Sequence, residues 1–474
     1  MPLLPVSTAP FTKEASHFMS PLDIQPAAAV EELSLSAIIG SLSYALDLTE
    51  GLPAGHSLRC CWVGMHVGRQ MGMDSEALSH LYYTLLLKDA GCSSNAARLF
   101  ELYGTDDRQV KRDFKQVDTD SLMRLGRFVM SHVGVGKSLH ERINRILKLA
   151  QSGEEFATEL ITTRCERGAH ISLQLGFDAE VADGIRCLDE HWNGRGKPAR
   201  LSGAAIPLAS RIALLAQVVE VFHSAEGEAH VLDEVRRRSG SWFDPAVVEA
   251  FLAAQRQPGF WAGLRDDALQ QRIGEIEPAS KVIRIDEQRL DTIAEAFAQV
   301  VDAKSHYTYG HSARVAIYTE AVATKLGLSH ERVRWLRRGA LLHDIGKLGV
   351  SNAVLDKPGK LEADEWEQVK AHAAYSEQIL SRLNIFSELA FVAAAHHERL
   401  DGKGYPRGLA ANKIPMETRI ITVADIFDAI TAERPYRGPI PVVDAIAMME
   451  KECDAAIDGA CLDALKQALP ELGF

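Results

Sequence analysis

The chain has 474 residues, of which 46% are hydrophobic and 24% are charged. This composition is that of an ordinary folded protein, and the length suggests about three domains or two large ones. A formal net charge of −12 excludes a basic surface as the general design. We therefore expect no DNA binding, and an anionic ligand would need a local cluster of cations.

Residues 1–30 are predicted to form a flexible arm. This stretch contains Pro2, Pro5, Pro10, Pro21 and Pro26. It lacks a basic segment followed by an apolar one, so we expect no signal peptide. The most apolar long run, Ile206–Phe222, carries Arg211 and Glu220, and we predict neither a transmembrane helix nor a membrane partner.

The seven cysteines include the adjacent pair Cys60 and Cys61 but no CxxC pair. A zinc ribbon or a disulfide framework is therefore not expected. Reduced thiols in a cytoplasmic protein fit this pattern.

The chain contains an internal repeat, and the repeat defines its domains. His56–Arg59 resembles His311–Arg314, and Leu86–Gly91 resembles Leu341–Gly346 at the same offset. At a second, shorter offset the matched pairs are Gly194–Pro198 with Gly402–Pro406, Ile206–Pro207 with Ile414–Pro415, and Arg211–Ile212 with Arg419–Ile420. The change of offset places extra residues in the first copy between Asp89 and Leu188, and Asp107–Lys115 is a candidate part of that insertion.

Apolar residues recur at helical spacing through most of the chain. One helical face consists of Leu290, Ile293, Ala294, Phe297, Val300 and Val301. Helices are also predicted at Arg332–Leu342, Glu365–Leu383 and Arg419–Thr431. We predict a mainly α fold with two tandem helical domains, one at residues 31–262 and one at 286–474, joined by a linker at 263–285.

The second copy concentrates metal-ligand residue types at the ends of apolar helices. These are His311, His343, Asp344, His372, His396, His397 and Asp425. Any one of them alone would read as an ordinary surface or core residue, but a buried carboxylate such as Asp425 needs a partner. One buried site that collects all seven satisfies each of them. Imidazoles bind ions such as iron, manganese or zinc, and a carboxylate such as Asp344 can bridge two of them.

Two motifs resemble those of the HD-GYP family of metal-dependent phosphohydrolases. The first is His343-Asp344-Ile345-Gly346-Lys347, and the second runs from His396 and His397 through Gly402-Lys403-Gly404-Tyr405-Pro406. The resemblance covers about the last 190 residues of the chain. It implies hydrolysis of cyclic di-GMP to linear pGpG, and in some members on to GMP, by a hydroxide that bridges two metal ions, with iron or manganese as the expected metals.

The resemblance also implies individual roles. The seven residues above would be metal ligands with Asp344 bridging, and Lys347 would neutralise the scissile phosphate. Arg314 is a second candidate phosphate contact. Residues Gly402, Lys403, Gly404, Tyr405 and Pro406 would form a substrate-binding loop at the rim of the site. Some members carry a Glu four residues before the first His and use it to hold a third metal; Tyr307 stands there in this chain, so we predict two metals and pGpG as the main product.

The first copy lacks most of this chemistry, and we predict a degenerate, non-catalytic module. His56 and Asp89 remain, but Lys88 stands where the second copy has His343. The other substitutions are Leu188 for His396, Asp189 for His397 and Gln217 for Asp425. The counterpart of His372 falls near Cys165. Its candidate roles are dimerisation, ligand sensing and regulation of the second copy.

Two alternatives to a cyclic di-GMP phosphodiesterase remain open from the sequence. The chain could be an HD phosphohydrolase that acts on another cyclic dinucleotide or a nucleotide. It could instead be a catalytically silent nucleotide-binding or scaffold protein. The resemblance also implies contact with diguanylate cyclase domains through the glycine-tyrosine-proline loop, and a homodimer is possible.

Overall fold

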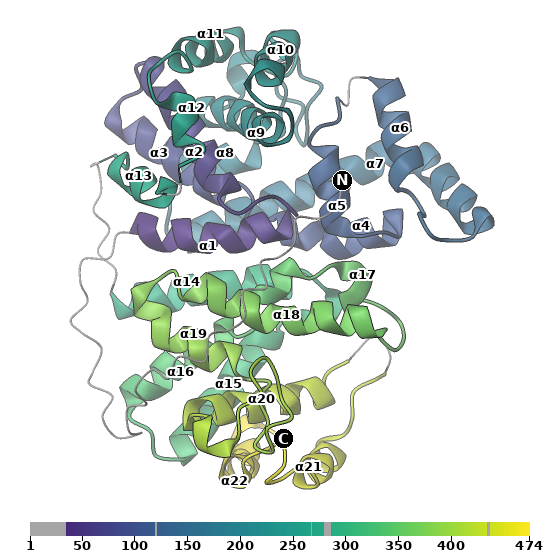
Figure 1. Cartoon of the computed structure of the whole chain (residues 1–474), viewed down its shortest axis with the longest axis vertical. Coiled ribbons are helices and arrows are strands. Elements are labelled where there is room, and N and C mark those ends of the chain that lie inside the picture. Colours follow the sequence, from purple (N-terminus) through teal and green to yellow (C-terminus); the bar gives the residue numbers. More distant parts are fainter. Residues whose placement is uncertain (1–34, 119–120, 267, 279–285, 434–436) are drawn as a thin grey trace. The chain divides into compact units, whose positions relative to one another are not determined.

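The computed structural model describes residues 35–118, 121–266, 268–278, 286–433 and 437–474 (Figure 1). The arm predicted for residues 1–30 lies outside this described part. Within it, the regular elements are helices, and strand pairing is limited to isolated bridges. The predicted mainly α fold is confirmed.

The first copy, purple to teal in Figure 1, contains α1 (Leu35–Thr49), α2 (His56–Gln70), α3 (Ser75–Leu87), α4 (Ala96–Tyr103), α5 (Asp107–Phe114), α6 (Leu122–His132), α7 (Leu139–Gln174), α8 (Ala179–Arg186), α9 (Leu208–Glu226), α10 (Glu228–Arg238), α11 (Pro245–Ala254), α12 (Phe260–Gly263) and α13 (Leu269–Glu275). The second copy, green to yellow, contains α14 (Glu287–Asp302), α15 (His311–Lys325), α16 (His330–Leu342), α17 (Asn352–Leu355), α18 (Ala363–Leu380), α19 (Ser387–Ala394), α20 (Met416–Thr431), α21 (Val442–Glu450) and α22 (Gly459–Ala468).

Local capping explains where several of these helices begin. The side chain of Ser329 accepts a hydrogen bond from the Arg332 backbone N–H at the start of α16. At the start of α18, Glu362 and Glu365 form a reciprocal capping box. Such caps satisfy backbone donors that have no partner inside the helix. They fix the start of α16, which His343 follows, and the start of α18, which contains His372.

The repeat is visible in the arrangement of helices. Helices α2 and α3 correspond to α15 and α16, and α8 and α9 correspond to α19 and α20, at the two sequence offsets. The extra residues of the first copy form α5, α6 and the first half of α7, because α4 matches α17 at the first offset. Together with the end of α4, they have a small apolar core of their own, formed by Leu102, Tyr103, Val110, Phe128 and Val133. The insertion is thus a helical subdomain, and the predicted candidate segment contains its helix α5.

Helix α9 lies at the centre of the first copy. It is the one described helix that is long and apolar enough to cross a membrane, and 67% of its apolar window is buried inside the protein. Its residues, including Leu215 and Val219, belong to the hydrophobic core. This burial is typical of a core helix of a folded domain.

In the described part of the chain, from Leu35 onward, the two copies pack into one compact unit with a continuous hydrophobic core. Part of the stretch predicted as a linker is helical, because α13 places Leu269 and Ile273 in that core. Its two apolar residues at helical spacing bind it to the first copy. The boundary between the copies therefore lies after α13, close to residues 279–285, which are outside the described part.

Candidate metal centre

Five segments of the second copy converge on one buried point. His311 is the first residue of α15, His343 and Asp344 follow α16, and His372 lies in α18. His396 and His397 follow α19, and Asp425 lies in α20. The structure brings all seven sequence-predicted ligand residues together, and all except the half-buried His397 are buried.

Asp344 is at the centre of this group, and its two carboxylate oxygens face different histidines. Oδ2 lies 3.3 Å from His311 Nε2 and 3.2 Å from His343 Nε2. Oδ1 lies 3.4 Å from His372 Nε2 and 3.8 Å from His396 Nε2. A carboxylate placed in this way can serve two ions at once.

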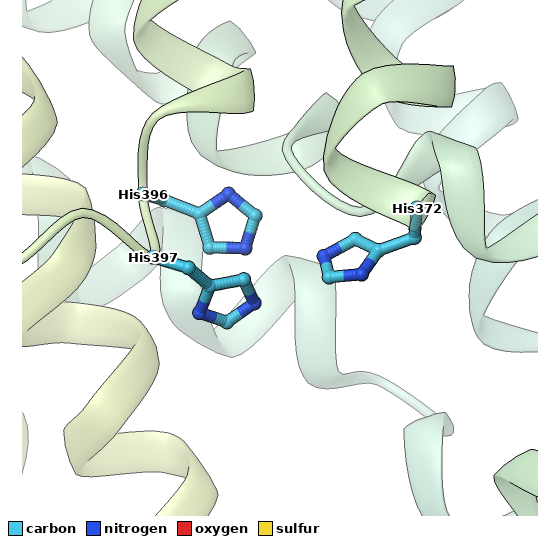
Figure 2. Close-up of side chains that lie close together, drawn as sticks. All are labelled: His372, His396 and His397. Carbon is cyan, nitrogen blue, oxygen red and sulfur yellow. The ribbon is translucent and has the colours of Figure 1, made fainter. Parts of the chain in front are cut away.

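The remaining ligand candidates complete two groups on either side of Asp344. In the first group, Asp425 Oδ1 lies 3.3 Å from His311 Nε2 and 3.8 Å from His343 Nε2. In the second group, the ligand atoms of His372, His396 and His397 lie within 4.8 Å of one another. Figure 2 shows these three rings turned toward one another, with His372 on one side and the adjacent pair on the other.

Hydrogen bonds on the far side of each ring fix its orientation. The Nδ1–H groups of His343, His372 and His396 donate to the carbonyl oxygens of Ala340, Val369 and Ala393, at 2.7, 2.5 and 2.5 Å. Because a carbonyl only accepts, Nδ1 carries the proton and Nε2 presents its lone pair to the centre. This is the arrangement that a metal-ligating histidine usually has.

The unpaired polar atoms at the centre fit a metal. The Nε2 atoms of His311, His343, His372 and His396, and Oδ1 of Asp344, are buried and have no hydrogen-bond partner. Buried polar atoms without partners are rare and costly in native proteins. Imidazole nitrogens and carboxylate oxygens around one point are donors that divalent ions such as iron, manganese or zinc accept. The residues present therefore fit the metal requirement of an HD-type site.

Burial and neighbouring charges shift the pKa of these side chains in different directions, and the contacts of His311 with Asp344, Asp425 and Asp428 outweigh its burial and raise its pKa well above the usual value. Burial lowers the pKa of His372 to about 4 and that of His396 to about 3, which keeps both rings neutral. Burial opposes ionisation of Asp344, but His343 and Lys347 outweigh it and hold the pKa of Asp344 well below its usual value. Metal binding requires neutral imidazoles and ionised carboxylates.

Asp428 is a functional residue that the sequence analysis missed. Its Oδ2 accepts a hydrogen bond of 2.7 Å from His311 Nδ1, and Arg314 binds both of its oxygens at 2.6 and 3.0 Å. The signal that could have revealed it is its position one helical turn after Asp425 on α20. Arg314 binds Asp428, which in turn contacts His311, and its predicted role as a phosphate contact stays a prediction.

Replacing Asp428 with asparagine should weaken metal binding by about tenfold to a hundredfold, because outer partners of ligating histidines contribute this much. An amide at this position lacks the negative charge that attracts the His311 N–H and the Arg314 guanidinium. The affinity is measurable by competition with a chelator. Asp444→Asn, an exposed residue of α21, is the control; equal affinities in the two variants would contradict the prediction.

The predicted substrate residues lie at the edge of the centre. Lys347 is in the short helix η4 (Ile345–Gly349), and its Nζ contacts Asp344 Oδ2. The Tyr405 ring lies 4.7 Å from the His397 ring, and Pro406 follows it through a cis peptide bond. Lys403, in contrast, is 81% exposed, and its nearest charged partner is Asp401 at 4.0 Å.

The glycine-rich loop has to approach the backbone closely. A Cβ on Gly404 would lie 2.4 Å from Arg399 N and 2.5 Å from His397 O, so only glycine fits there. Gly402 has a φ of +76°, which also favours glycine. Glu398 is buried and accepts hydrogen bonds from the backbone N–H groups of Arg407 and Leu409, which holds the loop against the centre.

The first copy keeps the outer shell of this arrangement. His56 Nδ1 contacts Glu220, and Arg59 donates to the same carboxylate at 2.6 Å. These three residues occupy the positions of His311, Asp428 and Arg314 in the repeat. The repeat motif in the sequence contains the histidine and the arginine of this trio, but the paired acid lies outside the matched segments.

Cations replace the metal ligands at the centre of the first copy. Lys88 Nζ lies 2.9 Å from His56 Nε2, contacts Asp89 and lies 3.2 Å from Gln217 Oε1. Lys115 Nζ lies 3.7 Å from the other oxygen of Asp89. Both carboxylate oxygens of Asp344 face histidines. The corresponding oxygens of Asp89 face the ammonium groups of Lys88 and Lys115.

The counterpart of His372 is Arg164 and not the neighbouring Cys165. A Cβ on Gly346 would lie 1.9 Å from His372 O, and a Cβ on Gly91 would lie 1.9 Å from Arg164 O. The same close packing thus identifies equivalent residues. The sequence estimate was one residue off because no motif marks this position across the insertion.

Comparison with known proteins agrees with this geometry. The family model described as "HD domain" matches residues 139–247 and 295–461, which together make up more than half of the chain. The chain belongs to the HD domain family. The two matched stretches lie in the two copies, and the assignment to the HD-GYP type made from the sequence is confirmed.

Known relatives match this chain over different shares of its length. A 3'3'-cGAMP-specific phosphodiesterase 3 of Vibrio cholerae is 52% identical over 435 residues, which cover 92% of this chain and 94% of that protein. The crystal structure of a cyclic GMP-AMP specific phosphodiesterase of V. cholerae superposes with a TM-score of 0.64 at 47% identity and covers 92% and 98% of the two chains. A cyclic di-GMP phosphodiesterase of Thermotoga maritima is 39% identical over 166 residues, 35% of this chain and 45% of that protein.

Proposed function

We propose that the protein is a metal-dependent phosphodiesterase that hydrolyses cyclic dinucleotides, with 3'3'-cGAMP as its preferred substrate. The observation that carries the proposal is the centre itself, in which two groups of imidazoles and carboxylates share Asp344. A carboxylate shared between two ligand groups is typical of two-metal phosphoester chemistry.

Residues of the second copy would hold two ions. His311, His343 and Asp425 would bind one ion, His372, His396 and His397 would bind the other, and Asp344 would contact both. Bound divalent ions would polarise the phosphoryl oxygen and supply a nucleophile at neutral pH. The identity of the metals, iron or manganese, and their number, two, stay predictions.

The surrounding residues would bind and orient the dinucleotide. Lys347 brings a cation to the edge of the centre, where it can offset the charge of the scissile phosphate. Tyr405, whose ring packs against that of His397, would lie beside the bound dinucleotide. Cleavage of one phosphodiester bond would release a linear dinucleotide. A second cleavage would be a separate step at the same residues.

The relatives support 3'3'-cGAMP over cyclic di-GMP as the substrate. The V. cholerae phosphodiesterase that matches almost the full length of both chains is specific for 3'3'-cGAMP. The T. maritima cyclic di-GMP phosphodiesterase covers about a third of this chain. Cyclic di-GMP, the substrate named from the sequence motifs, is therefore the second candidate.

Because all seven cysteines are free thiols, we also infer a reducing cytoplasm. Contact with diguanylate cyclase domains and dimerisation stay predictions.

A substrate panel tests the proposal. The manganese- or iron-loaded protein is incubated separately with 3'3'-cGAMP, cyclic di-GMP and cyclic di-AMP, and products are separated by chromatography. We expect turnover to linear dinucleotides, with kcat/KM for 3'3'-cGAMP at least about tenfold above the other two. A preference for cyclic di-GMP would overturn the substrate assignment. The absence of turnover in protein with measured metal content would overturn the enzymatic function.

A further inference from the structure

Helix α5 of the insertion contacts the catalytic copy directly behind the metal centre. Asp107, the first residue of α5, is fully buried, and its Oδ1 accepts a hydrogen bond of 2.8 Å from the backbone N–H of Asn352. The next residue, Arg108, donates from Nη1 to the carbonyl of Gly349. Two consecutive residues of α5 therefore bind the backbone between η4 and α17.

The second oxygen of Asp107 lies between two buried ammonium groups. Oδ2 is 3.5 Å from Lys304 Nζ of the catalytic copy and 3.7 Å from Lys111 Nζ of α5 itself. The carbonyl of Lys304 accepts a hydrogen bond of 2.7 Å from the Asn352 side chain. Asp107 thus ties together α5, Lys304 and the start of α17. A buried charge held by several partners in this way is costly to disturb.

The segment that α5 binds carries a residue at the edge of the active centre. Gly349 ends η4, which contains Lys347, and the Lys347 backbone N–H donates to the Asp344 carbonyl at 2.8 Å. Ser376 holds the other side of η4, because its hydroxyl accepts from Gly346 N and donates to His343 O. Helix η4, which carries Lys347, is therefore held by α18 on one side, and α1 and α5 of the first copy contact it as well.

The far end of α5 reaches the degenerate centre of the first copy. Lys111 Nζ lies 3.7 Å from Glu50 Oε1, and Lys115 Nζ lies 2.7 Å from Glu50 Oε2. Lys115 also lies 3.7 Å from Asp89, the counterpart of Asp344. A continuous chain of buried alternating charges therefore runs from the degenerate centre to the back of η4.

We propose that α5 is a positioning element for catalysis, and that Asp107 is its main contact. By holding the backbone at Asn352, next to the contact of Arg108 with Gly349, Asp107 keeps Lys347 beside Asp344, and the first copy takes part in the reaction without touching substrate. The activity readout rests on the proposed function. The structural readout described below does not.

The test uses Asp107→Asn in the full-length protein. The amide keeps the side-chain volume and the acceptor for Asn352 N–H, but it loses the charge that faces Lys304. We expect kcat on the cyclic dinucleotide to fall about tenfold, because a small displacement of a catalytic group is costly. KM should change less than kcat, since the substitution removes no group that contacts the substrate. The matched control is Asp113→Asn on the same helix, whose carboxylate pairs with Arg112 and His132 inside the insertion.

Two further measurements separate positioning from general destabilisation. In a Lys347→Met background, Asp107→Asn should cause no further loss of kcat, whereas a general structural effect would add to it. Hydrogen–deuterium exchange of residues 346–352 should accelerate in Asp107→Asn and in Arg108→Ala, but not in Asp113→Asn. The second measurement needs no substrate and remains informative if Asp107→Asn is less stable.

The outcomes are distinguishable. A kcat for Asp107→Asn within about twofold of wild type, with unchanged exchange at residues 346–352, would overturn the inference. An additive loss in the Lys347→Met background would do the same. Wild-type protein that turns over none of the dinucleotides would instead overturn the proposed function, and the exchange experiment alone would then decide the role of Asp107.

Discussion

Asp344→Asn is expected to remove both the bound metal and the phosphodiesterase activity. Each oxygen of Asp344 faces a different pair of histidines, so one substitution affects both ligand groups. Asparagine keeps the volume but offers one neutral oxygen and an N–H₂ group that repels a cation. We expect less than one bound metal ion per chain and a rate of dinucleotide hydrolysis at least about a hundredfold lower. This loss is at least as large as that expected when a residue that only hydrogen-bonds a ligating histidine is replaced.

Metal content measured by mass spectrometry and the rate of dinucleotide hydrolysis check this prediction together. The control is Asp463→Asn, an exposed aspartate in α22 of the same copy, which should retain both properties. Thermal unfolding monitored by circular dichroism shows whether the variant is folded. Asp344→Asn protein that keeps wild-type metal content and more than about a tenth of the activity would refute the central position of this carboxylate.

Gly346→Ala is expected to be nearly as damaging, although the substitution adds a single methyl group. The added Cβ would lie 1.9 Å from the His372 carbonyl oxygen and 2.6 Å from Ser376 N. Both are backbone atoms of α18, so no side chain can move aside to make room. Helix η4 would have to shift away from α18, which separates Asp344 from His372, now 3.4 Å apart. We expect an activity loss of about a hundredfold or more.

The comparison that isolates this clash is Gly359→Ala. A Cβ on Gly359 would meet no atom within 4 Å, and this glycine precedes the same helix, α18. We expect wild-type activity from Gly359→Ala. The melting temperature of each variant reports the part of the effect that is general destabilisation. If Gly346→Ala were as active as Gly359→Ala, the close contact between η4 and α18 would not be needed for the reaction.

The fold class, the repeat and the seven candidate ligands could all be predicted from the amino-acid sequence. These features are local, because amphipathic spacing sets helices such as α14 and short motifs place His343 and Asp344 at the end of one. The predicted helix Arg419–Thr431 corresponds to α20, and Glu365–Leu383 corresponds to α18, which ends three residues earlier. The need for glycine at motif positions such as Gly404 can also be predicted, because the close backbone contact involves residues only a few positions away.

Only the tertiary structure decided which residues support the centre and how the copies are joined. The contacts of Asp428 with His311 and Arg314 join positions more than 100 residues apart, and no periodicity predicts such a pair. The equivalence of Arg164 and His372 could not be read from the sequence, because the insertion changes the offset between the copies and no motif marks this position. The contact of Asp107 with Asn352 joins residues of different copies. Buried polar groups take whichever partner packing brings within reach, so their roles depend on the three-dimensional neighbours and not on the local sequence.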